Sequence, residues 1–162
     1  MSHFEVIGGA LHAENVPLAR IAEQVGTPVY VYSTEAFREA ARAFRKGLEP
    51  VGRHHVAFAV KANPNLAVLR LLANEGFGAD VVSGGELSRA LAAGIPAHDV
   101  VFSGVGKTRK ELHQALDAGI GQFNLELEEE GVVLAEIARS RGMTAPAALR
   151  VNPDVDAGTH EK

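Results

Sequence analysis

The sequence has no cysteine and no tryptophan, and aromatic residues make up only 6% of its 162 residues. Without cysteine, the chain cannot form a disulfide, supply a thiolate nucleophile or bind a metal through sulfur. The absence of cysteine is compatible with a reducing compartment, and we expect the protein to be cytoplasmic. The seven histidines show no metal-ligand spacing, so no metal site is predicted.

Long apolar runs and clusters of basic residues are also missing. No apolar stretch approaches the roughly 20 residues that a membrane span needs. The N-terminus (MSHFE) lacks the basic and apolar regions of a signal peptide. Net charge is −4 without a basic block, so we expect neither a membrane nor a nucleic-acid partner. With 46% hydrophobic and 22% charged residues, the composition is that of a globular protein with one core.

The most informative stretch is an unbroken apolar run, residues 56–60 (VAFAV), that ends in Lys61. Such a run predicts a strand buried on both faces, as in a parallel sheet. Asn63 is predicted to cap the next helix, with Pro64 in its first turn. Lys61 would then lie at the strand end, the edge where α/β folds bind ligands. Apolar walls there would disfavour the ammonium form and leave an amine suited to Schiff-base chemistry; a solvent-facing structural lysine is the alternative.

A strand-and-helix rhythm runs through the rest of the chain. Apolar strands start at intervals of 21 to 25 residues, near Val56, Ala79, Val100, Gln122 and Ala147. The helical patterns between them mostly end in a glycine, at Gly76, Gly94, Gly119 and Gly142. This regularity favours the first five units of a (β/α)8 barrel over an open five-stranded α/β domain. In the barrel interpretation, the chain is the N-terminal part of a longer protein.

Local signals predict further elements. Residues 83–86 (SGGE) and 108–111 (TRKE) are each predicted to form a capping box at a helix start. Residues 16–25 have a helical stripe, residues 28–32 (PVYVY) resemble a strand, and a helix capped by Ser33 or Thr34 should run to about Arg45 with Gly47 as its stop. Residues 4–11 are predicted to form a short strand without an evident partner.

Charged residues interrupt the predicted strands. Asp80 could lie beside Lys61 on a neighbouring strand and order its amine, although a solvent-facing acid is the simpler interpretation of that segment. Arg150, flanked by Leu and Val, needs an anionic partner, either a cofactor oxygen or a carboxylate such as Asp80. Lys107 is expected to be a loop cation near the mouth of the site, because the glycine of a phosphate-binding loop is absent five positions before Gly106.

Five motifs together resemble the diaminopimelate decarboxylase family of fold-type III pyridoxal-phosphate enzymes. They occur in the family's order over nearly the whole chain: residues 30–32 (YVY), 58–63 (FAVKAN), 80–87 (DVVSGGEL), 106–108 (GKT) and 149–154 (LRVNPD). Each motif is modest by itself, but five in register are specific. One departure is Leu127, where the family usually has a small polar residue at a helix cap.

The resemblance implies a fold, a cofactor and site residues. The fold would be the N-terminal part of a pyridoxal-phosphate-binding (β/α)8 barrel of the alanine racemase type, without the family's C-terminal β domain. Lys61 would be the catalytic residue and would hold pyridoxal 5'-phosphate as a Schiff base. Asp80 would lie beside that linkage, Ala59 would line the ring pocket, and Arg150 would approach the ring hydroxyl.

The resemblance also implies domains, a reaction and partners. Residues 1–27 would be a segment that joins the second domain, and residues 28–162 the incomplete barrel. The reaction would be decarboxylation of meso-2,6-diaminopimelate to L-lysine in a cytoplasmic homodimer. The family's phosphate-binding glycines, the acid at the pyridine nitrogen, and the residues donated across the dimer interface would lie beyond residue 162. We therefore expect this chain alone to be inactive.

Three alternatives remain open. One is another fold-type III decarboxylase or racemase that acts on a different basic amino acid. Another is a non-catalytic pyridoxal-phosphate-binding barrel, although residues 4–11 and the motif at residues 152–154 (NPD) argue against such a short single-domain protein. A third is a stable, inactive fragment of the same parent enzyme.

Overall fold

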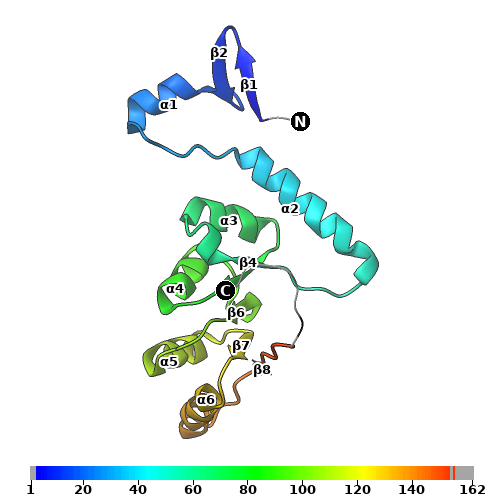
Figure 1. Cartoon of the computed structure of the whole chain (residues 1–162), viewed down its shortest axis with the longest axis vertical. Helices are drawn as coiled ribbons and strands as arrows, with labels where there is room; N and C mark the ends of the chain where they lie inside the picture. The colour runs from blue at the N-terminus through cyan, green and yellow to red at the C-terminus, as the bar shows by residue number, and fades with distance from the viewer. Residues whose placement is uncertain (1–2, 154, 156–162) are drawn as a thin grey trace.

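The computed structural model describes residues 3–153 and 155, which form a small N-terminal sheet and a larger parallel sheet (Figure 1). The N-terminal part is an antiparallel three-stranded sheet in the order β1-β2-β3, followed by one helix. The bounds of these elements are β1 Phe4–Ile7, β2 Ala10–Ala13, β3 Val16–Pro17 and α1 Leu18–Val25.

The prediction of one unpaired strand over residues 4–11 is wrong, because this segment folds back on itself. Gly8 and Gly9 have φ values of 60° and 83°, a conformation that glycine adopts readily and that closes a tight hairpin between β1 and β2. Glu14 links this hairpin to the N-terminus of helix α2 (Thr34–Leu48). Its carboxylate accepts hydrogen bonds from Ser33 Oγ at 2.8 Å and from the Glu35 amide at 3.0 Å.

The predicted strand over residues 28–32 is not formed. The segment has no regular secondary structure, and Tyr30 is 88% exposed. Its apolar alternation is typical of a strand, but a strand also needs a neighbour to accept its backbone hydrogen bonds, and no described strand pairs with it. The helix that follows, α2 (Thr34–Leu48), is capped by Ser33 as predicted, but it continues through Gly47.

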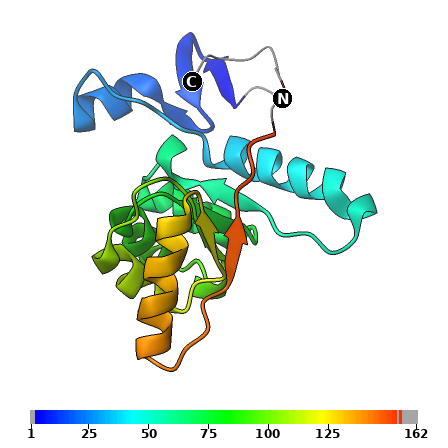
Figure 2. The same ribbon diagram turned by 60° about the horizontal axis from the view of Figure 1, so that its bottom comes forward.

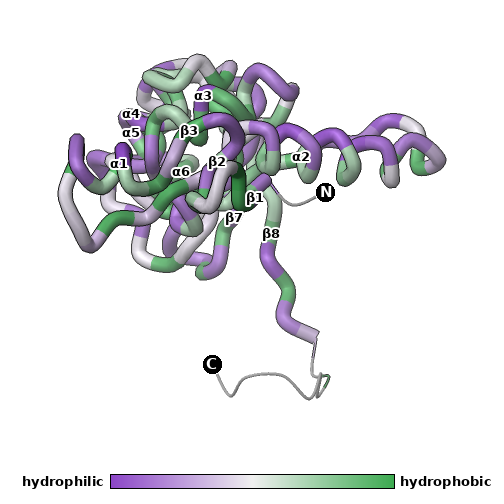
Figure 3. The backbone as a smooth tube through the Cα atoms, turned by 90° about the horizontal axis from the view of Figure 1, so that it is seen from above, coloured by the Kyte–Doolittle hydropathy of each residue, from purple (hydrophilic) through white to green (hydrophobic). Residues whose placement is uncertain are grey.

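Helix α2 lies beside the parallel sheet and is mostly hydrophilic along its length (Figure 3). Its apolar side packs against α3 through Phe37 and Ala41. The residues on the other side of this small core are Val68, Leu72 and Phe77. Arg42 of α2 adds a two-point ion pair to Glu75, with both N–O distances 3.0 Å.

The larger sheet is parallel, and its strand order β4-β5-β6-β7-β8 follows the order of the chain. The strands are β4 Ala57–Ala59, β5 Gly78–Val81, β6 Val100–Phe102, β7 Gln122–Leu125 and β8 Ala147–Leu149. The helices between them are α3 Leu66–Asn74, α4 Gly84–Ala92, α5 Arg109–Ala118 and α6 Glu128–Ser140. The five strand positions confirm the predicted rhythm.

The helices α3 to α6 cover one face of this sheet, and β8 lies at its edge (Figures 1 and 2). An open doubly wound sheet would instead reverse its strand order and carry helices on both faces. Sequential parallel order with helices on one side is the arrangement of a (β/α) barrel. The fold is therefore a partial barrel, as the sequence predicts.

The two faces of the sheet differ in burial. The helix-facing residues form the main core and are almost completely buried, among them Val81, Val100, Phe102 and Phe123. The opposite, inner face carries residues that are half-buried, including Ala59, Asp80, Val101, Gln122 and Asn124. The strands therefore have one closed apolar face and one open face with polar residues.

Helix termini follow the sequence signals with one correction. Thr108 and Glu111 form the predicted capping box, whereas Glu86 accepts from the Val82 amide rather than from Ser83. Ser83 still caps α4 through the Glu86 amide. Glycines at positive φ end the helices at the predicted positions Gly76, Gly94, Gly119 and Gly142.

A buried ion pair joins the loop after β6 to the start of α6. The Lys107 side chain is only 1% exposed and that of Glu130 7%, with 3.4 Å between Nζ and Oε2. Lys107 Nζ also donates to the carbonyls of Gly104 and Asn124, each at 2.6 Å. The prediction that Lys107 is a loop cation near the mouth of the site is wrong, because these carbonyls and the carboxylate enclose its ammonium.

Glu130 satisfies backbone donors around this ion pair. Its carboxylate accepts from the amides of Gly106, Lys107 and Glu126 at 3.0 to 3.3 Å. Helix α6 begins with Leu127 at its N-cap, which provides no side-chain hydrogen bond, so Glu130 takes over part of the capping. Burial acts to raise the pKa of Glu130, but the Glu126 amide and the Lys107 ammonium outweigh burial and lower that pKa.

Replacing Glu130 by Gln should destabilise the protein strongly. The change leaves the Lys107 ammonium buried without a counter-charge, which costs about 3 kcal/mol of unfolding free energy. Urea denaturation measures this loss. Glu128→Gln, in the exposed first turn of the same helix, is the matched control and should cost less than about 1 kcal/mol. Equal losses in the two variants would contradict a stabilising role for the ion pair.

Acid should remove the difference between wild type and Glu130→Gln. A carboxyl whose pKa is lowered by folding contributes stability above its ordinary value of about 4.5, and this contribution is lost as the pH falls through the lowered pKa. The gap in unfolding free energy should therefore be constant near neutral pH and narrow below about pH 4.5. Urea titrations over a pH series measure it, and a gap that widens in acid would contradict the assignment.

Candidate functional site

Lys61 lies at the carboxyl edge of the parallel sheet, as predicted, in a short 3-10 turn after β4. This turn, η2, spans Val60–Ala62. Val60 is fully buried and anchors the turn in the core, whereas Lys61 is exposed. Within residues 3–153 and 155, the Lys61 side chain has no hydrogen bond or ion pair. The turn therefore presents a free amine at the edge where parallel sheets bind ligands.

Two details of the prediction around Lys61 are wrong. The strand covers three residues, and its inner face is open, so Lys61 is not surrounded by apolar walls. The cap of α3 is Asn65, whose Oδ1 accepts from the Ala67 amide at 2.9 Å. Asn63 instead accepts from the Asn65 amide at 3.1 Å, which makes a turn before the helix and shifts the cap by two residues.

Asp80 lies on the strand next to Lys61. In the parallel register Asp80 pairs with Ala59, and neighbouring strands are about 4.8 Å apart. Ala59 and Asp80 are both half-buried on the inner face. Ala59 is the last residue of β4 and precedes Lys61 by two positions. Asp80 and Lys61 share no hydrogen bond in the described part of the chain; the carboxylate instead accepts from Ser103 Oγ at 2.5 Å.

A chain of polar side chains continues from Asp80 across the inner face. Asn124 Nδ2 donates to Ser103 Oγ at 2.9 Å, and Gln122 Nε2 donates to Asn124 Oδ1 at 2.7 Å. The sequence analysis missed these three residues. The available signal was Gln122 and Asn124 at alternate positions of one strand, which places two amide side chains on the same face.

Arg150 follows β8 and pairs with Glu126 rather than with Asp80. Its Nη1 donates to both carboxylate oxygens of Glu126, at 2.9 and 3.1 Å, while Glu126 also accepts from the Gly104 amide. The Arg150 side chain is 57% exposed, so the expectation of a buried strand arginine is wrong. Glu126 ends up nearer because it follows β7, the strand beside β8, whereas Asp80 is on β5.

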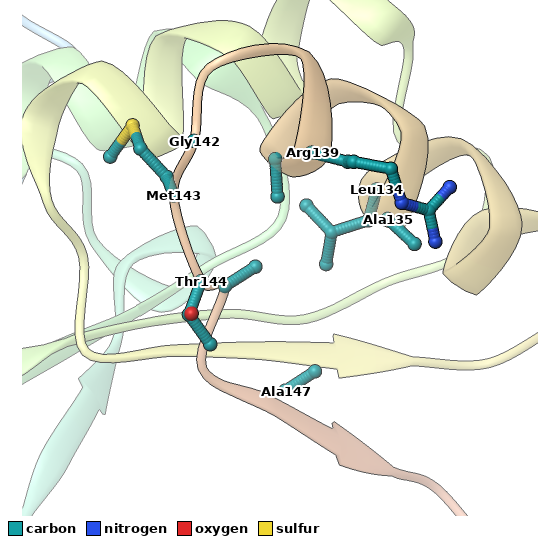
Figure 4. Close-up of a pocket in the computed structure, with 9 residues that line it drawn as sticks. Leu134, Ala135, Arg139, Gly142, Met143, Thr144 and Ala147 are labelled. Carbon is teal, nitrogen blue, oxygen red and sulfur yellow. The ribbon is translucent and has the colours of Figure 1, made fainter.

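A hollow of about 470 Å³ lies at the other edge of the sheet, between the end of α6 and the start of β8 (Figure 4). Leu134, Met143 and Ala147 give it an apolar lining, and Arg139 is the charged residue beside it. Because the hollow lies before β8 rather than after it, it is separate from the edge that carries Lys61.

The described residues contain no cluster of three or more potential metal ligands, and no described helix is long and apolar enough to cross a membrane.

The carboxyl edge therefore combines three kinds of group. Lys61 provides a nucleophilic amine, Asp80 a carboxylate held by hydrogen bonds, and Arg150 a partly exposed guanidinium. Amines of this kind add to carbonyl groups, and a guanidinium binds oxyanions and phenolate oxygens. The edge thus has the groups to bind a cofactor that carries an aldehyde and anionic oxygens.

Curated relatives match this chain from end to end. It is 54% identical to a diaminopimelate decarboxylase of Zymomonas mobilis over 100% of its length and 53% identical to one of Pseudomonas fluorescens over 99%. The chain spans 39% and 38% of the length of these two relatives. Both are thus more than twice as long as the sequence described.

Solved structures agree with the topology. A diaminopimelate decarboxylase from M. jannaschii, solved with L-lysine, superimposes with a TM-score of 0.86 at 40% identity, over 97% of this chain and 37% of that one. Residues 34–162 match the family model described as the pyridoxal-binding domain of pyridoxal-dependent decarboxylases. That match includes every strand and helix of the partial barrel, and the chain therefore belongs to the pyridoxal-dependent decarboxylase family.

Proposed function

We propose that this chain is the lysine-bearing N-terminal part of a diaminopimelate decarboxylase, which converts meso-2,6-diaminopimelate to L-lysine and CO2. The observation that carries the proposal is Lys61, an exposed amine without a described partner at the carboxyl edge of the sheet. The identity of 46 to 54% to decarboxylases of this name supports the choice of substrate.

The residues at this edge fit pyridoxal 5'-phosphate. Its aldehyde needs an accessible amine, which Lys61 offers, and its ring needs space beside small side chains such as that of Ala59. Asp80 supplies a negative charge beside the linkage between the cofactor and Lys61. Arg150 supplies a positive charge for the oxygen on the cofactor ring. When bound, the cofactor supplies an electron sink for the bond that breaks at the substrate's Cα.

The residues of this chain bind the cofactor and orient it. Lys61 would hold the cofactor through its amine, and the same amine would take up or give a proton at the edge of the sheet. Asp80 stabilises positive charge beside that amine. Arg150 must share its guanidinium between Glu126 and the ring hydroxyl, and its exposed position leaves donors free for this contact.

We further propose that the segment 1–27 joins a second, β-rich domain of the longer protein. Its hairpin exposes Val6 and Leu11, at 70% and 47%, and because these residues are paired across β1 and β2 they form an apolar patch on one face, suited to packing against another sheet. The complete enzyme would be a cytoplasmic homodimer, as the resemblance implies. Cytoplasmic residence is also in keeping with the absence of cysteine.

Borohydride reduction in the presence of pyridoxal phosphate should attach the cofactor permanently to Lys61. Intact mass should show one pyridoxyl adduct per chain, and peptide mapping should place it on Lys61. The Lys61→Ala variant should lose at least about nine-tenths of the adduct, because other exposed lysines lack the orienting groups around it.

Lys46→Ala, at the exposed end of α2, is the matched control and should keep the full adduct. An adduct spread evenly over exposed lysines, or equal yields in the two variants, would show that Lys61 is an ordinary surface lysine.

The 162-residue chain should bind cofactor without decarboxylating diaminopimelate. It spans under two fifths of its relatives, and the expected phosphate-binding and substrate-binding residues are not on its described elements. Release of CO2 from carboxyl-labelled substrate measures this activity, with a full-length relative as positive control. Turnover by the chain at the rate of that relative would refute the assignment of these functions to the missing part.

A further inference from the structure

We propose that Ser103, Asn124 and Gln122 are positioning residues that hold Oδ1 of the Asp80 carboxylate on the β6 side of β5, so that Oδ2 stays available to Lys61 on the β4 side. This inference rests on the proposed function, because it concerns how the edge that receives the cofactor is kept in order. It names residues from β7 and from the end of β6, which do not themselves reach Lys61.

The hydrogen bonds run in one direction. Gln122 donates to Asn124, Asn124 donates to Ser103, and Ser103 donates to Asp80. Each side chain donates to the next one toward the carboxylate, so the three hydrogen bonds form one directed series that ends on Asp80 Oδ1. This series of hydrogen bonds crosses from β7 to β5 and fixes the direction in which the Asp80 side chain points.

The backbone beneath this chain is held in place from the core side. Lys107 Nζ donates to the carbonyl of Gly104, the neighbour of Ser103, and to the carbonyl of Asn124, each at 2.6 Å. The buried ammonium therefore holds the main chain of Asn124 and of the residue that follows Ser103. Hydrogen-bonded side chains on a backbone that is held in this way can keep a carboxylate within a narrow range of orientations.

The other charged groups at this edge have partners of their own. Charged residues near the carboxyl ends of β4 to β8 include Lys61, Glu86, Lys107, Glu126 and Arg150. Glu86 accepts from the Val82 amide, Lys107 pairs with Glu130, and Glu126 pairs with Arg150. Among the described residues at this edge, Lys61 is the cation without a partner, so an oriented Asp80 acts mainly on it.

A purely structural role makes a different prediction. If these side chains only satisfy one another on the inner face, removing one would change stability and leave the chemistry of Lys61 untouched. If they position Asp80, the effect must appear at Lys61 and must depend on Asp80. The two roles are therefore separable by measuring Lys61 directly.

The test is Ser103→Ala, with the bound cofactor's visible absorbance followed against pH. A carboxyl group oriented beside the cofactor linkage stabilises positive charge there, so the loss of this orientation should lower the midpoint of the absorbance change by about one pH unit. The dissociation constant for pyridoxal phosphate should rise about tenfold, the same free-energy difference. Ser103→Thr keeps the hydroxyl and should restore both values.

Two comparisons test whether the effect of Ser103 on Lys61 passes through Asp80. Ser88→Ala removes a serine with two hydrogen bonds on α4, at 2.9 and 3.0 Å, and should leave the midpoint unchanged. In an Asp80→Asn background, Ser103→Ala should shift the midpoint no further, because the group it positions is already neutral. Additive shifts in the double variant would overturn the inference.

A measurement without cofactor separates this inference from the proposed function. Competitive acylation should label Lys61 in Ser103→Ala about threefold faster than in wild type, with exposed Lys110 as internal standard. If wild type forms no adduct with pyridoxal phosphate, the proposed function fails, and the labelling alone decides the inference. If wild type forms the adduct but neither midpoint nor labelling responds to Ser103→Ala, only the inference fails.

Discussion

The buried ion pair between Lys107 and Glu130 is the interaction on which the carboxyl edge of the sheet depends. It lies where the loop after β6, the end of β7 and the start of α6 meet, and it satisfies backbone groups on all three. A pair of charges in a core is costly unless every donor and acceptor is used, and here the carbonyls and amides around it complete the set. Side chains that face the site extend from the backbone segments that this ion pair holds in place.

The sheet has two faces with separate tasks. On the helix side, close-packed apolar residues supply the burial that stabilises the fold. On the inner side, side chains from successive strands form two polar groups, the chain that ends on Asp80 and the Glu126–Arg150 pair. Because parallel strands bring their carboxyl ends to one edge, Asp80 and Asn124, which are 44 positions apart in the sequence, are linked there through Ser103.

This arrangement supports the proposal that the partial barrel carries the lysine to which the cofactor attaches. Lys61 depends on β4, the turn anchored by Val60 and the neighbouring strand, all of which lie within the described residues. The open inner face leaves its amine accessible. Under the proposed function, the groups that complete a catalytic cycle would lie in the part of the longer relatives that this chain does not span.

The sequence by itself determined the order and position of the five parallel strands, the capping box at Thr108 and the place of Lys61 at a strand end. These features follow from local patterns, since periodicity, caps and glycine stops act within a few residues. Only the tertiary structure decided that residues 28–32 form no strand, that Lys107 is buried and that Arg150 pairs with Glu126. It also revealed the chain from Gln122 to Asp80. Each of these outcomes depends on which strand lies next to which and on what is packed behind it, and such contacts between distant residues leave no local signal.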